Sequence, residues 1–61
     1  MTRARAIAAY LRRRGPTPLP ILMEEFERRG YTVPGFVHAL AHGLEIGLLE
    51  AGVDWTVRAA R

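Results

Sequence analysis

The sequence contains no cysteine, no serine and no lysine. Without cysteine, the chain can form neither disulfides nor thiolate metal sites. Small secreted domains usually depend on such cross-links, so we expect a reducing, cytoplasmic environment. Because cysteine and serine are both missing, the usual nucleophiles of acyl transfer are missing too. These absences argue against a disulfide-rich secreted protein and against a hydrolase that uses such a nucleophile.

Long apolar runs are also missing. No stretch approaches the roughly 20 apolar residues of a membrane span, and no long apolar core follows the basic residues 1–14. We therefore expect no association with a membrane and no signal peptide. A chain of 61 residues has room for one domain, residues 1–61, and for no deep cleft between layers. We predict that it is not an enzyme and that it takes no cofactor and no small-molecule substrate.

Positive charge is plentiful and is carried by arginine alone. Nine arginines outnumber six acidic residues, which gives a formal net charge of +3. A basic balance is the first property expected of a nucleic-acid-binding protein. The codon bias of a GC-rich genome would also enrich arginine, so the positions of the arginines matter more than their number.

The first half of the chain has two segments with the apolar spacing of amphipathic helices. Residues 2–14, capped by Thr2, repeat apolar side chains at the intervals i, i+3, i+4 and i+7, and residues 19–29 do the same. Gly15 and Pro16 end the first helix. The apolar positions are Ala4, Ile7, Ala8 and Leu11 in the first helix, and Leu19, Leu22, Met23 and Phe26 in the second.

A third helix is expected over residues 34–48, with Thr32 as its N-cap. One apolar face of this helix is predicted to be buried, and it consists of Val37, Leu40, Ala41, Leu44 and Leu48. The opposite face is then expected to be exposed, and it holds Gly35, His38, Ala39, His42, Glu45 and Ile46, with Phe36 beside it.

The last part of the chain changes from a helical to a two-residue repeat. Val53, Trp55 and Val57 alternate with polar side chains, which predicts a hairpin of strands 48–50 and 53–58 around a tight turn at 50–52. An extended piece around Thr17 could pair with this hairpin. We expect Trp55 to pack in the core; the alternative is that Trp55 or Tyr10 stacks on nucleic-acid bases.

The order of these elements resembles the winged helix-turn-helix superfamily, and residues 18–58 carry the resemblance. Residues 19–29 are similar to the first helix of the motif, 30–33 to its turn and 34–48 to its recognition helix. Gly47-Leu48-Leu49-Glu50, Gly52 and Trp55-Thr56-Val57 resemble the passage into the wing. The resemblance implies a mainly α domain with a small β-hairpin, and binding to DNA in transcription regulation.

The DNA hypothesis assigns contacts to phosphates rather than to bases. Between Thr32 and Asp54 the chain has no Arg, Lys, Asn or Gln, the residues that commonly read base edges. The candidate nucleic-acid-binding residues are Arg3, Arg5, Arg12, Arg13, Arg14, His38, His42 and Arg58. Arg28 and Arg29 are expected to pair with Glu24 and Glu25 one helical turn earlier. For Arg12–Arg14 the alternative is a solvated helix end that complements the dipole.

The alternative function is a protein interaction, or formation of a homodimer, through the third helix. Small residues recur every four positions in this segment, at 35, 39, 43 and 47. They would let another backbone approach closely, so the candidate partner-binding residues are Gly35, Ala39, His42 and Ile46. The competing interpretation is that the small residues pack against the first helix of the same domain.

A metal site is a further possibility. His38, His42 and Glu45 follow one another on one side of the third helix, a spacing that metal sites use. No further ligand stands out elsewhere, so we expect a solvent-facing polar stripe and no metal.

Overall fold

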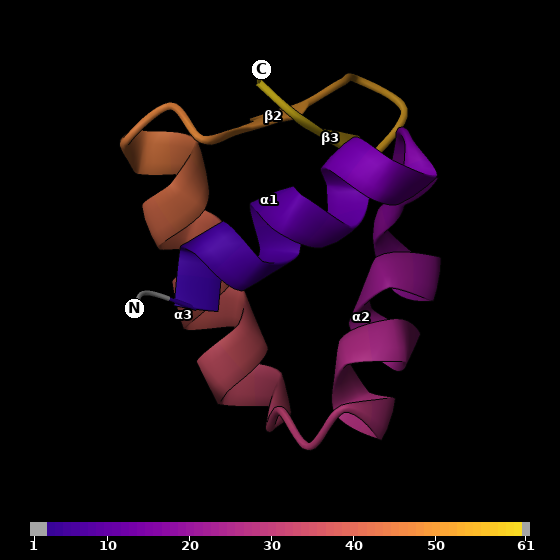
Figure 1. The fold of residues 1–61 in the computed structure, drawn as a ribbon, viewed down its shortest axis with the longest axis vertical. Helices are drawn as coiled ribbons and strands as arrows, with labels where there is room; N and C mark the ends of the chain where they lie inside the picture. Colours follow the sequence, from indigo (N-terminus) through magenta and orange to yellow (C-terminus); the bar gives the residue numbers. More distant parts are fainter. Residues whose placement is uncertain (1–2, 61) are drawn as a thin grey trace.

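The computed structural model describes residues 3–60, which form three helices and a small antiparallel sheet of three strands (Figure 1). The elements are α1 (Arg3–Arg14), β1 (Thr17–Pro18), α2 (Leu19–Arg28), α3 (Val33–Glu45), β2 (Leu49–Ala51) and β3 (Thr56–Ala59). The expected mainly α architecture with a small β-hairpin is confirmed. The predicted cap Thr2 lies outside the described residues.

Helix α1 buries the apolar face that the sequence predicts. Ala4, Ile7, Ala8 and Leu11 are all buried, and every arginine of the helix is exposed. The helix ends at Gly15, which adopts a positive φ of 89° and donates its N–H to the carbonyl of Leu11. A left-handed residue of this kind suits glycine and stops the helix.

The turn between α2 and α3 is also as predicted. Gly30 has a φ of 95°, and Tyr31 donates its N–H to the carbonyl of Phe26 at 3.0 Å. Thr32 then caps α3, because its Oγ1 accepts the N–H of Gly35 at 3.1 Å. Figure 1 shows α2 and α3 meeting through this turn at the end of the molecule opposite the sheet.

The sheet joins the segment that follows α1 to the hairpin near the end of the chain. Its strand order is β1-β3-β2, and both neighbours run antiparallel to β3. Thr17 lies opposite Val57, so the short extended piece after α1 does pair with the hairpin. Thr17 is buried, and its hydroxyl donates to the carbonyl of Gly15 at 3.0 Å. The buried side chain of Val57 joins the sheet to the helical core.

Phe26 lies at the centre of the core. The rings of Tyr10 and Tyr31 meet it edge-on at centroid distances of 5.5 and 5.1 Å, and Phe36 lies 5.7 Å away. Such aromatic pairs add packing energy beyond the area that they bury. The residues of this core come from every helix and from β2 and β3: Ile7, Ala8, Leu11, Leu22, Phe26, Phe36, Ala39, Leu49 and Val57.

The predicted buried face of α3 is wrong by one position. Phe36, Ala39 and Gly43 are buried, whereas Val37 and Leu44 are 47% and 39% exposed. Ala41 is exposed as well, and Leu40 and Leu48 are only partly buried. Apolar residues occupy most positions of α3, so its periodicity allows two choices of face. Burial of the large Phe36 ring against Phe26 favours the face that holds Phe36, Ala39 and Gly43.

The hairpin is shifted along the chain relative to the prediction. Its strands are Leu49–Ala51 and Thr56–Ala59 rather than 48–50 and 53–58, and α3 ends at Glu45 rather than at 48. The turn is formed by residues 52–55 instead of 50–52. Gly52 donates its N–H to Thr56 O at 2.9 Å, and Trp55 donates its own to Gly52 O at 3.1 Å. The alternating pattern was misleading because half of it lies in a loop.

Trp55 is therefore not a core residue. It is 68% exposed and has a φ of 63°, which is uncommon for a side chain of this size. Its carbonyl accepts the N–H of Leu19 at 2.8 Å, which ties the loop to the start of α2. The side chain is exposed because Trp55 lies in the hairpin turn and not in a strand of the sheet.

Candidate functional site

The outer surface of α1 gathers arginines that the sequence assigned to nucleic acid. Arg5 and Arg12 are two turns apart, and Arg13 lies beside them; all three are exposed. Together with Arg29, from the end of α2, they line a hollow of about 470 Å³ whose other walls are Ala6, Ala9 and Tyr10. We call Arg5, Arg12, Arg13 and Arg29 the arginine face. Helix α1 has five arginines and no acidic residue, so no carboxylate on α1 reduces the positive electrostatic potential of this face.

Arg29 is held in the arginine face by an ion pair and by an aromatic ring. Its Nε donates to Glu25 Oε2 at 3.1 Å, and its guanidinium carbon lies 4.9 Å from the centroid of the Tyr10 ring. The ion pair confirms the predicted pairing with Glu25, one turn earlier on α2. The cation–π contact links the end of α2 to the outer surface of α1, and the sequence alone did not reveal that contact.

Two of the remaining candidate arginines lie apart from this face. Arg58, on β3, donates from Nε to Glu50 Oε1 on β2 at 2.9 Å, so its charge is paired across the hairpin. Arg14 is exposed at the end of α1, outside the walls of the hollow. Arg28, which was expected to pair with acidic residues, lies 3.5 Å from both Glu24 and Glu25.

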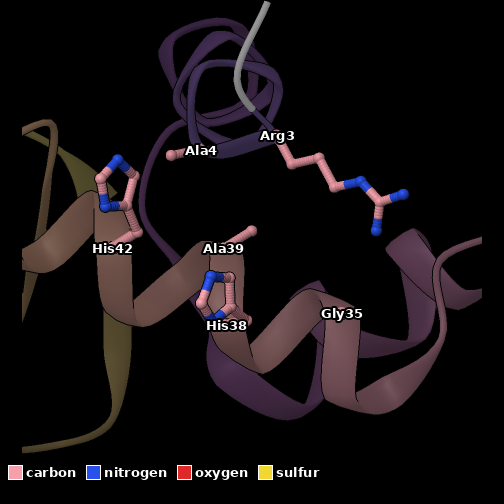
Figure 2. A pocket seen from close by; sticks show the side chains of 6 residues that line it. All are labelled: Arg3, Ala4, Gly35, His38, Ala39 and His42. Carbon is pink, nitrogen blue, oxygen red and sulfur yellow. The ribbon is translucent and has the colours of Figure 1, made fainter.

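Arg3, His38 and His42 form a second group. They line a hollow of about 400 Å³ between the start of α1 and α3, and its floor is Ala4, Gly35 and Ala39 (Figure 2). Arg3 extends over Gly35 toward Tyr31, and its guanidinium lies 5.5 Å from the centroid of that ring. In Figure 2 the two imidazoles lie on the other side of the hollow, away from the guanidinium. The structure thus brings these three predicted residues together without making them converge on one point.

Two of the small residues of α3, Ala39 and Gly43, are buried inside the domain. A Cβ atom added to Gly43 would lie 2.6 Å from Leu49 Cδ1 and 3.4 Å from Ala4 Cβ. Ala39 is buried and Gly35 is half-buried. The prediction that Ala39 lies on an exposed partner-binding face is therefore wrong, whereas Gly35 is only half-buried and lies beside the Arg3 side chain of α1.

Gly47 has a different role from the one its spacing suggested. It follows the end of α3 with a φ of 80°, and Leu48 donates its N–H back to Gly43 O at 2.9 Å. This is the geometry of a helix C-terminus closed by glycine. Ile46 is exposed, as predicted, and it borders a shallow hollow with Arg12, Gly47 and Leu48.

The side of α3 that turns away from α1 is apolar. Val33, Val37 and Leu44 are exposed, and Ala41 is exposed between them. We call Val33, Val37, Ala41 and Leu44 the outer stripe. A surface helix of a monomeric domain usually presents polar residues on its outer side, and a helix that is apolar all round is typically buried. His38, His42 and Glu45 lie along one border of the stripe.

The hairpin loop also exposes apolar side chains. Val53 and Trp55 are exposed in the hairpin loop, so the Trp55 ring is accessible for stacking. Within residues 3–60, no group of three or more His, Cys, Asp or Glu side chains could hold a metal ion. In the same range, no helix has the length and apolar character needed to cross a membrane.

Comparison with protein-family models, with curated proteins and with solved structures gives no match. The surfaces of the domain are therefore the guide to its function. Of these, the sequence located the arginines of α1 and the two histidines. The sequence did not predict that Arg29 belongs to the arginine face. The two-turn spacing of Arg5 and Arg12 did indicate the other members of this face. The sequence assigned the outer stripe to the core.

Proposed function

We propose that this domain binds nucleic acid, DNA in particular, by contacting backbone phosphates with its arginine face. The observation that carries the proposal is the exposure of Arg5, Arg12 and Arg13 on one side of a helix that holds no acidic residue. Arginine is well suited to phosphate because its planar guanidinium donates two parallel hydrogen bonds.

The dimensions of α1 support this function. Arg5 and Arg12 are seven residues apart, which corresponds to about 10 Å along a helix axis. Duplex DNA presents a phosphate charge every 1.7 Å or so of its axis, so several phosphates lie within reach of such a pair. Ala6 and Ala9 keep the surface between the arginines low, which favours close approach of a backbone.

The same surfaces argue for binding that does not depend on base sequence. Contacts to phosphates position a protein on a duplex but carry no base information. The exposed side of α3 offers valine, leucine and histidine where base recognition calls for Arg, Asn or Gln. A role in transcription regulation, which the winged-helix resemblance implies, would then depend on a partner or on coating of DNA.

Fluorescence anisotropy with a labelled duplex of about 20 base pairs tests the proposal. If three arginines neutralise phosphates, affinity should fall about 40-fold between 50 and 200 mM salt. The double variant Arg5→Ala/Arg13→Ala should bind more weakly at 50 mM salt, and its affinity should then fall only about threefold over that range.

The matched control is Arg28→Ala/Arg58→Ala, which removes the same charge from arginines that are paired with glutamates. This control should keep the steep salt dependence. Equal weakening by both double variants would contradict the arginine face as the site, and so would the absence of binding by the unmodified protein at 50 mM salt.

A further inference from the structure

The outer stripe of α3 needs an explanation of its own, because it takes no part in phosphate binding. Val33, Val37, Ala41 and Leu44 present a row of exposed apolar side chains, while Phe36, Ala39 and Gly43 already bury the other side of the same helix. The domain is small, so its core does not require this second face. We infer that the outer stripe is the surface on which a second copy of this chain docks.

Charge favours a second copy at this place. Each chain carries a formal net charge of +3, and two arginine faces would repel each other. The outer stripe holds no charged side chain between residues 33 and 44, and the first charge on α3 is Glu45 at its end. Two identical chains can therefore approach along α3 without opposing like charges, and an antiparallel arrangement also sets the two helix dipoles in opposition.

The spacing of the stripe is self-complementary. A two-fold axis close to position 39 of both helices, with the helices antiparallel, places Val37 opposite Ala41 of the second copy. The same axis brings Val33 beside Leu44 of the second copy. A larger side chain then meets a smaller one near the crossing point, as in closely packed helix pairs.

The available area predicts a weak dimer. A standard interface buries about 800 Å² on each partner, and the whole domain exposes 4310 Å². Helix α3 has 13 residues and is therefore about 20 Å long. One face of such a helix buries less than the standard area, so we expect a dissociation constant of about 100 μM. Dimerisation leaves both arginine faces uncovered, because their residues belong to α1 and the end of α2.

Sedimentation equilibrium from about 10 μM to about 1 mM tests this inference, since that range brackets the expected constant. The apparent mass should rise from the 6.8 kDa of one chain toward twice that value. Val37→Glu should raise the dissociation constant at least tenfold, and Val53→Glu should leave it unchanged. Val53 is a fitting control because it is fully exposed in the hairpin loop and receives the same substitution.

A constant mass of one chain up to about 1 mM would overturn the inference and leave the stripe to a different protein. Equal loss of association in both variants would overturn it too. Far-UV circular dichroism establishes that each variant is folded. A mixture of Val37→Glu and Ala41→Lys chains should associate better than either chain alone, and failure to do so would overturn the antiparallel register. All these measurements are made without nucleic acid, so their outcome is independent of the proposed function.

Discussion

Helices α1 and α3 are both amphipathic by their spacing, yet only the buried face of α1 is predicted correctly. Arginines on the outer side of α1 leave one apolar stripe, which is the one that is buried. On α3, apolar residues occur on both sides, so two stripes one position apart satisfy the same period. Charge on the outer side of a helix is therefore as informative about its buried face as apolarity on the inner side.

The largest change in stability is expected from substitutions that test which side of α3 packs in the core. Phe36→Ala should destabilise the domain by about 3–5 kcal/mol, because it removes a fully buried ring beside Phe26. Val37→Ala, next to it in sequence but exposed, should change stability by no more than about 0.5 kcal/mol. Urea denaturation followed by circular dichroism measures both values. The reverse order of effects would mean that the outer stripe is the buried one.

An intermediate effect is expected for Gly43→Ala. Alanine is the better helix former by about 0.5–1 kcal/mol. The new methyl group would nevertheless lie 2.6 and 2.9 Å from two carbon atoms of the buried Leu49 side chain. Overpacking of this kind typically costs about 1–3 kcal/mol. We expect a net loss of stability, seen as a lower thermal midpoint; a higher midpoint would show that Leu49 moves aside without cost.

The smallest expected effect concerns the outer side of α1. Arg5→Ala/Arg13→Ala should leave the free energy of unfolding within about 0.5 kcal/mol of the original, because both side chains are exposed and no ion pair of theirs occurs among residues 3–60. Urea denaturation at low and high salt measures this. A marked loss of stability would mean that these arginines stabilise the fold.

Much of the local structure could be predicted from the sequence. The glycines at 15 and 30 and the cap at Thr32 act at the expected positions because they depend on neighbours a few residues away. The strands of the hairpin were harder to predict. Alternation from Val53 to Val57 resembles a strand, but the turn of residues 52–55 includes half of it, and Trp55 is consequently exposed.

The candidate surfaces also differ in how far they could be predicted from the sequence. The arginines of α1 could be located from the sequence, because buried positions on one side of a helix determine which residues lie on the other. The contribution of Arg29 could not, because it depends on how α2 crosses α1 and places a guanidinium over Tyr10. The burial of Ala39 could not be predicted either, because it depends on how α1 packs against α3.

The sequence alone predicts the existence and approximate extent of three helices and a hairpin, the buried face of α1 and the gathering of arginine on its outside. These features follow from spacing and from local hydrogen bonds. The choice between the two apolar faces of α3 is made by the packing of the whole domain. That choice depends on the fit of Phe36 to Phe26 and of Gly43 to Leu49, contacts between residues far apart in the chain that periodicity cannot distinguish.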